Sequence, residues 1–154
     1  LNIDTFSELS KIDSTDFDMA ISIFTVLGYI TEKEEIKKVF DQIYNLLKPG
    51  GYYMFDLERR AGYDQYLRTP DGIVRDQPND LVTVKLKDDN LNLVDYHEKS
   101  NGVLPNGIEF SYSESFTIKF WTADEIHSIL EEIGFSKIEK INYGNTDYYI
   151  VKKH

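Results

Sequence analysis

Two stretches of the chain place polar groups where α/β proteins bind ligands. Ser22 to Tyr29 follows a short apolar run that is typical of a buried strand, and Asp56 ends a second such run. Ligands of open α/β sheets bind outside the carboxyl ends of the strands, so both positions are expected to be exposed there. The pattern predicts a ligand-binding edge. It does not indicate a reaction, because no residue in the chain is a diagnostic catalytic acid, base or nucleophile.

A carboxylate and a group of arginines are further candidates for chemistry. Glu114 interrupts a run of alternating apolar residues, and a carboxylate among aromatic side chains lies either at the rim of a sheet or in a site. Arg59, Arg60 and Arg68 follow Asp56 closely. They are expected either to hold an anionic substrate group or to be solvated surface residues.

Residues 16–56 are predicted to form a β-α-β unit. Two short apolar runs flank a segment in which apolar residues recur at helical spacing, as expected for parallel strands buried on both faces. Thr31 and Glu34 have the spacing of a capping box and predict the start of the helix. Pro49 with Gly50-Gly51 predicts its end. This unit is half of a doubly wound α/β sheet.

Residues 57–120 change period. Residues 57–79 are predicted to be irregular, with one short helix around 63–67. Residues 81–87 and 91–98 form a predicted hairpin, and a turn at 105–107 opens the longest alternation of the chain. One face of that alternation carries Ile108, Phe110, Tyr112, Phe116, Ile118 and Phe120.

The final third returns to helical order and then to strands. Thr122 and Glu125 form a second predicted capping box, and Gly134 is expected to end that helix. Residues 137–142 and 146–152 are predicted strands joined by a tight turn at 143–145.

Composition limits the function classes. The 154 residues suffice for one domain, and 17 basic against 27 acidic side chains give a formal net charge of -10. Such a chain is repelled by phosphate backbones and anionic lipid, so neither nucleic acid nor membrane is an expected partner. There is no cysteine, which excludes disulfides and Cys-based zinc sites, and no metal site is expected. With no transmembrane run or leader in the sequence, a cytoplasmic protein is the default expectation.

Three motifs, taken in order, resemble those of a known family. Asp16-Phe17-Asp18 leads into a strand, Gly28-Tyr29 lies just beyond it, and Leu47-Lys48-Pro49-Gly50-Gly51 turns into the next strand. From about residue 2 to its end, the chain resembles the C-terminal part of a class I S-adenosylmethionine-dependent methyltransferase. It is most similar to the small-molecule group that includes amino-sugar and glycine-type N-methyltransferases. The resemblance implies a Rossmann-like sheet with an antiparallel insert and a closing hairpin.

The resemblance also implies S-adenosylmethionine as the cofactor and assigns residues to it. Asp4, followed by Thr5, occupies the place of an acidic residue that reaches the adenine amino group; alternatively, these two residues cap a helix or turn at 7–10. The backbone near Phe24 and Thr25 is implied to meet the methionine part, and Leu27 to border the transferring methyl group.

Candidate catalytic residues are implied by the same resemblance. Residues 57–120 resemble a substrate-covering subdomain, and methyl transfer to nitrogen mainly requires positioning and exclusion of water. Tyr29 is implied to border the methyl group, or else it packs at the start of the helix. His97, Tyr96, Tyr112 and Glu114 are candidates for orienting the nucleophile or taking its proton, although His97 also fits an ordinary exposed histidine.

The glycine-rich turn of such methyltransferases is missing, because Gly-x-Gly occurs nowhere in the chain. The resemblance therefore implies that roughly the first 100 residues of the domain lie outside this sequence. The leading hypothesis is the C-terminal portion of a methyltransferase acting on a small-molecule amine or hydroxyl, which is not expected to bind the cofactor tightly alone. The alternative is a non-catalytic α/β module that pairs through its sheet edge, either as a homodimer or with a missing N-terminal half.

Overall fold

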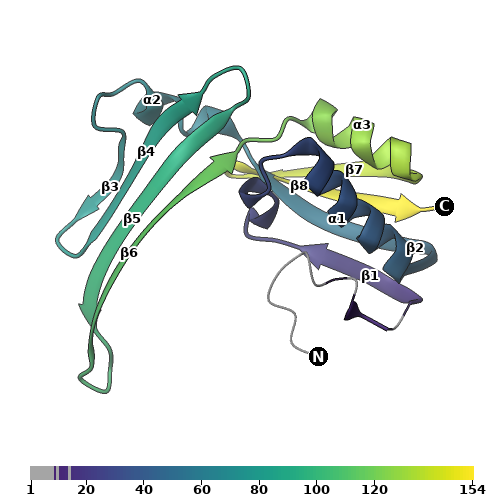
Figure 1. The fold of residues 1–154 in the computed structure, drawn as a ribbon, viewed down its shortest axis with the longest axis horizontal. Helices are drawn as coiled ribbons and strands as arrows, with labels where there is room; N and C mark the ends of the chain where they lie inside the picture. Colours follow the sequence, from purple (N-terminus) through teal and green to yellow (C-terminus); the bar gives the residue numbers. More distant parts are fainter. Residues whose placement is uncertain (1–8, 10, 14) are drawn as a thin grey trace. The chain divides into compact units, whose positions relative to one another are not determined.

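The computed structural model describes residues 9, 11–13 and 15–154, apart from the side chains at 137 and 138. The described residues form two compact units, those up to residue 58 together with 121–154 and those from 59 to 120. Each unit has its own four-stranded sheet (Figure 1). The predicted cofactor residues Asp4 and Thr5 lie outside the described part of the chain.

A mixed sheet forms the first unit. Its strands are β1 (Phe17–Ser22), β2 (Leu47–Glu58), β7 (Phe135–Tyr143) and β8 (Thr146–Lys153), in the order β1-β2-β8-β7. β1 pairs in parallel with β2, while β8 runs antiparallel to both β2 and β7. The predicted fold class is confirmed: a Rossmann-like half sheet with a β-α-β unit, an antiparallel insert and a closing hairpin.

Helix α1 (Lys33–Leu46) connects the two parallel strands, and its start differs from the prediction. Its N-cap is Glu32, which makes no side-chain capping bond, so the predicted capping box of Thr31 and Glu34 is wrong. The chain first forms a short 3-10 helix, Val26–Tyr29, and then extends, which places Thr31 one residue before the cap. Backbone hydrogen bonds from residues 35 and 36 to the Glu32 carbonyl open the helix instead.

Helix α3 (Ala123–Ile133) begins and ends as its sequence predicts. The Thr122 side chain accepts a hydrogen bond from the backbone N–H of Glu125, whose carboxylate accepts one from the Thr122 N–H. The helix closes at Gly134, whose φ of 111° places it in the left-handed region. A Cβ at Gly134 would lie 3.1 Å from the Tyr44 hydroxyl, so the position favours glycine for both reasons.

The core of the first unit lies between the sheet and the two helices, which cover the same face of it (Figure 1). Phe55 of β2 stacks on Tyr149 of β8 with ring centroids 5.2 Å apart, and Phe40 of α1 packs against Phe55. Burying these aromatic side chains contributes the largest hydrophobic areas of the unit. β1 forms an edge of this sheet, because among the described residues it pairs only with β2.

The second unit is an antiparallel meander with a short helix. Its strands, β3 (Ile73–Gln77), β4 (Asp80–Asp88), β5 (Leu93–Val103) and β6 (Glu109–Lys119), pair in sequence order, and α2 (Asp64–Leu67) precedes them. The helix and both hairpins were predicted, whereas β3 was not. Most of its residues are exposed, so the strand has no buried face that would produce an alternating pattern.

The two faces of this sheet have different chemistry. We define the polar face by Thr83, Lys85, Asp95, His97, Ser115 and Thr117, which lie in two cross-strand rows. We define the aromatic face by Val84, Tyr96, Tyr112, Glu114 and Phe116, which occupy the alternate positions. A small core lies at one end of the aromatic face, and it is packed by Tyr63, Tyr66 and Leu67. Towards the β5–β6 turn that face is exposed, with Tyr112 at 41%.

Candidate functional site

The chain leaves β1 through a loop with an unusual backbone. Phe24 has a φ of 67° and Thr25 a φ of 56°, so two consecutive residues other than glycine are in the left-handed region. Such a conformation costs on the order of 1–3 kcal/mol for each residue, and it is rare for β-branched threonine. The loop, residues 23–30, lies at the carboxyl end of a parallel strand, which is where open α/β sheets bind ligands.

Asp56 of β2 lies beneath this loop. Its Oδ1 accepts a hydrogen bond of 2.9 Å from the backbone N–H of Thr25, and the residue is only 2% exposed. Burial raises the pKa of Asp56 above its ordinary value, while the backbone N–H groups of Thr25 and Phe24 act in the opposite direction. The prediction that Asp56 is exposed is therefore wrong. β2 continues to Glu58, so Asp56 lies inside the strand and not beyond its end.

The other end of the loop is bound by Trp121. The indole Nε1–H of this buried residue donates to the backbone carbonyl of Ile30 at 2.8 Å and to that of Leu27 at 3.2 Å. Trp121 directly precedes the capping residue of α3, so the bond links residues 27–30 to that helix. This role of Trp121 leaves no local signal in the sequence, because the carbonyls that its indole binds are more than 90 residues away.

The predicted site residues of this loop differ in how far their side chains are exposed. Phe24 is 83% exposed and Tyr29 is 55% exposed, whereas Leu27 is fully buried in the core. The N–H of Thr25 is occupied by Asp56, and its hydroxyl donates to the Phe24 carbonyl at 2.8 Å. The loop therefore presents two aromatic side chains outward, while the Leu27 side chain has no surface of its own.

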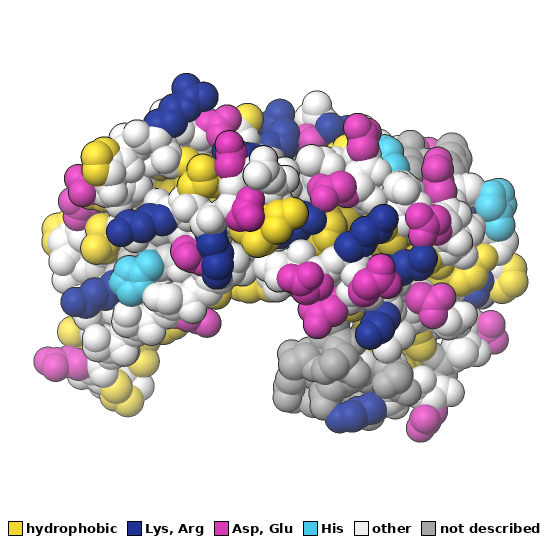
Figure 2. Space-filling model, turned by 45° about the horizontal axis from the view of Figure 1, so that its top comes forward, with side chains coloured by type: hydrophobic (Ala, Val, Ile, Leu, Met, Phe, Trp, Pro, Cys, Tyr) yellow, Lys and Arg dark blue, Asp and Glu magenta, His cyan; other side chains and the backbone are white. Residues whose placement is uncertain are grey.

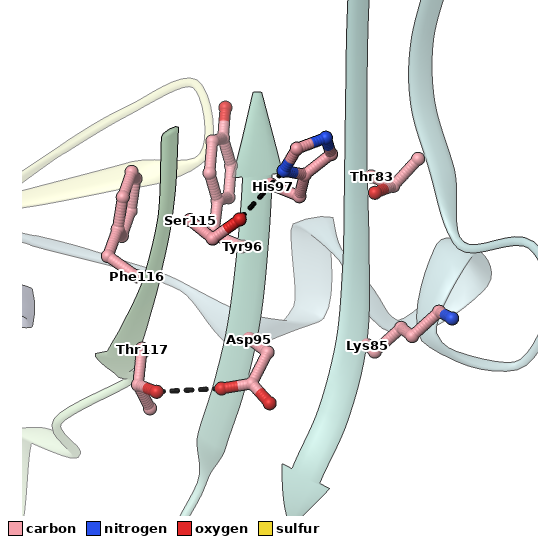
Figure 3. A pocket seen from close by; sticks show the side chains of 8 residues that line it. All are labelled: Thr83, Lys85, Asp95, Tyr96, His97, Ser115, Phe116 and Thr117. Carbon is pink, nitrogen blue, oxygen red and sulfur yellow. Dashed lines mark hydrogen bonds between the residues drawn. The ribbon is translucent and has the colours of Figure 1, made fainter. Parts of the chain in front are cut away.

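His97 lies on the polar face of the second unit. Its Nδ1 is 2.8 Å from the hydroxyl of Ser115 on the neighbouring strand (Figure 3). The two residues line a hollow of about 410 Å³ with other polar-face residues, and Tyr96 and Phe116 also border it. In the next row, Thr117 donates to Asp95 at 2.6 Å, and this bond together with Lys87 lowers the pKa of Asp95. The hollow is thus lined largely by side chains that already bind one another.

Tyr112 lies on the opposite face of the same sheet. His97 is paired with Ser115 and Tyr112 with Ser100, so the two predicted catalytic residues alternate in register and point to different faces. The Tyr112 hydroxyl donates to the carboxylate of Glu114. Tyr96 and Phe116 stack on this face with ring centroids 4.8 Å apart. Because the sheet separates them, His97 and Tyr112 cannot both touch one small molecule.

The guanidinium of Arg60, one of the three arginines that follow β2, has partners of its own. Arg60 binds the carboxylates of Asp64 and Asp89 and the side chain of Asn92, all within the second unit. The Arg60 guanidinium is therefore already bound by side chains of the second unit. On the face drawn in Figure 2, acidic and basic side chains are interspersed.

The described residues contain neither a cluster of metal ligands nor a membrane-spanning helix. Among them, no group of three or more His, Asp or Glu side chains is placed to hold a metal ion. No helix in the same part of the chain has the length and apolar character needed to cross a lipid bilayer.

Comparison with solved structures identifies the fold. A S-adenosylmethionine-dependent methyltransferase from Clostridium acetobutylicum matches 99% of this chain with a TM-score of 0.74 and 20% identity. The CcbJ methyltransferase from Streptomyces caelestis matches 98% with a TM-score of 0.74 and 15% identity. CalS10, an amino pentose methyltransferase from Micromonospora echinaspora whose structure holds S-adenosylmethionine, matches 91% with a TM-score of 0.65 and 13% identity.

These likenesses concern the fold, because all three identities are low. The chain spans only 61%, 62% and 59%, respectively, of the three matched proteins. No protein-family model matches it, and no curated protein matches it in sequence. The chain therefore has the fold of the C. acetobutylicum, CcbJ and CalS10 methyltransferases over about three-fifths of their length.

Proposed function

We propose that this chain contributes to an enzyme that transfers a methyl group from S-adenosylmethionine to a small-molecule amine or hydroxyl. The observation that carries the proposal is the loop at residues 23–30, strained and bound at both ends, at the carboxyl end of a parallel strand. The fold likeness to the C. acetobutylicum and CcbJ methyltransferases supports the same interpretation.

The groups that the loop exposes fit this cofactor. When bound, S-adenosylmethionine supplies an electrophilic methyl group on a sulfonium cation. The aromatic faces of Phe24 and Tyr29 suit a cation of that kind, since the ring quadrupole attracts positive charge. We propose that Leu27 acts only by supporting this loop from the core. From the resemblance alone, we also propose that Asp4, followed by Thr5, reaches the adenine amino group.

For the second unit we propose a role in holding the substrate. The aromatic face carries apolar rings beside the Tyr112–Glu114 pair. A substrate amine would donate to the Glu114 carboxylate, and the proton that nitrogen loses on methylation would pass to that carboxylate. Under this assignment Tyr112 orients Glu114. His97, on the other face, is the competing candidate, with Ser115 fixing its ring.

We further propose that the edge of β1 pairs with a strand outside these 154 residues. Among the described residues β1 pairs only with β2, and a strand edge without a partner favours association. The matched solved structures are longer than this chain, which supports a strand of the same protein over a second copy.

Calorimetric titration of S-adenosylhomocysteine into the full polypeptide that carries these residues tests the cofactor. We expect saturable binding that Phe24→Ala weakens. Tyr143→Ala serves as the matched control, because Tyr143 is a 77% exposed aromatic residue at the β7–β8 turn. Absence of binding by the full polypeptide, or equal losses in both variants, would contradict the proposal.

A methyl-transfer assay with labelled cofactor and a panel of small amines and alcohols then tests the substrate face. Tyr112→Phe is expected to raise KM, because it removes the hydroxyl that orients Glu114, whereas His97→Gln is expected to leave KM unchanged. The reverse result would move the substrate to the polar face.

A further inference from the structure

The loop at residues 23–30 has a backbone conformation that its own residue types do not favour. Two consecutive left-handed residues lie at its start, and the sequence offers neither glycine nor asparagine at either position to make that conformation easy. Two bonds lie inside the loop, from the Thr25 hydroxyl to the Phe24 carbonyl and from the Gly28 N–H to the Thr25 carbonyl, and further bonds come from residues outside it.

Asp56 supplies the bond at the strained start. Its carboxylate accepts the Thr25 N–H at 2.9 Å, at the point where the backbone turns. Because Asp56 is 2% exposed, it has no surface with which to touch a ligand, so its effect on binding must pass through the loop.

Asp56 and Trp121 bind opposite ends of the same loop. The Trp121 indole N–H holds the carbonyls of Leu27 and Ile30, and Asp56 holds the amide of Thr25. Between these points lies the 3-10 helix that carries Tyr29 outward, and Phe24 lies directly before Thr25. Tyr29 therefore lies between the two anchors and Phe24 directly beside the first of them, so the direction of both exposed rings depends on a fixed backbone at these points.

We infer that Asp56 is a positioning residue: it holds the loop at residues 23–30 in its left-handed conformation so that Phe24 and Tyr29 present a preformed surface to the bound ligand. Preorganisation of this kind lowers the entropy that a ligand must remove on binding. The identity of the ligand rests on the function proposed above, but the contact between Asp56 and the loop does not.

The test uses the full polypeptide and three substitutions. Asp56→Leu removes the acceptor and keeps the branched shape of the side chain, with methyl groups in place of the smaller oxygen atoms. Asp56→Asn keeps an oxygen for the Thr25 N–H. Asp147→Asn is the matched control, because Asp147 is also a buried carboxylate of the same sheet, paired with Lys140 on the neighbouring strand. Amide hydrogen exchange of residues 23–30 and calorimetric affinity for S-adenosylhomocysteine are measured for each variant.

We expect Asp56→Leu to raise exchange in residues 23–30 and to weaken S-adenosylhomocysteine binding by about tenfold or more. Asp56→Asn is expected to restore most of both quantities, and Asp147→Asn to leave both unchanged. Unchanged exchange in Asp56→Leu, or an equal effect of Asp147→Asn, would overturn the inference.

One outcome separates this inference from the proposed function. If the unsubstituted protein does not bind S-adenosylhomocysteine while Asp56→Leu still loosens residues 23–30, the proposed function fails and the positioning role stands.

If Asp56→Leu does not fold, Asp56→Glu replaces it, because it moves the carboxylate by one methylene and keeps the charge. Exchange equal to that of the unsubstituted protein in Asp56→Glu would then overturn the inference.

Discussion

Replacing Trp121 by phenylalanine should reveal how much the bond between the loop and α3 contributes to stability. The substitution keeps an aromatic ring but removes the indole N–H that reaches the Ile30 carbonyl at 2.8 Å and the Leu27 carbonyl at 3.2 Å. The Leu27 carbonyl also accepts the backbone N–H of Ile30, so only the Ile30 carbonyl loses its observed partner. The structural cost therefore concentrates on one carbonyl and on the space left by the smaller ring.

The expected size follows from these two losses. A lost hydrogen bond and an unsatisfied partly buried carbonyl cost about 1–3 kcal/mol together, and the smaller ring in a buried position adds about 1 kcal/mol. We expect the free energy of unfolding to fall by about 2–4 kcal/mol, which lowers Tm by roughly 5–15 °C for a protein of this size.

Urea denaturation followed by far-UV circular dichroism measures this change, because that signal does not depend on the removed tryptophan. Phe135→Leu is the control, since it removes part of a buried ring that makes no hydrogen bond. Both variants should lose stability, but only Trp121→Phe should speed amide exchange in residues 26–30. A loss below about 0.5 kcal/mol, as for a surface substitution, would refute the assigned role of the indole.

Three further predictions test the caps and the buried carboxylate. Thr122→Ala should cost about 1 kcal/mol by thermal melting because it breaks a formed capping box, whereas Thr31→Ala should be nearly neutral because α1 has no side-chain cap. Gly134→Ala should cost about 1–2 kcal/mol in the same assay, because alanine is strained at a φ of 111° and its Cβ would crowd Tyr44; a neutral result would contradict that geometry. Burial raises the pKa of Asp56 in the folded state, so the unsubstituted protein loses stability as pH rises from the ordinary carboxyl pKa through that raised value. The stability of Asp56→Asn relative to the unsubstituted protein should therefore rise with pH across this interval in parallel urea titrations, and a relative stability that falls would show the opposite shift.

Local patterns in the sequence predicted most of the elements. The β-α-β unit, both hairpins of the insert and the closing hairpin each produce a periodic apolar pattern with turn residues at their ends. The capping box at Thr122 formed because its helix begins directly after it. The similar spacing at Thr31 failed because a 3-10 helix upstream shifts the start of α1 to Lys33. A capping motif is thus informative only when the preceding chain allows the helix to begin there.

The site was less predictable, because its geometry depends on contacts between distant residues. The switch-point rule located the loop after β1, but the left-handed residues, the burial of Asp56 and the bond from Trp121 have no local signal. Alternation identified the face that carries Tyr112. It did not place His97 on the other face, because that requires the pairing of His97 with Ser115, and register between strands depends on the whole hairpin.

The order of pairing in the two sheets also has a consequence for folding during synthesis. Every strand of the second unit pairs only with its neighbour in sequence, so that sheet can form as soon as residue 119 has left the ribosome. In the first unit, Tyr52 of β2 pairs with Lys152 of β8, which follows the insert in the sequence. One edge of β2 must therefore wait while the whole insert is synthesised. We expect the second unit to acquire protection in nascent chains before the first, and slow translation of residues 121–153 to prolong the exposure of β2.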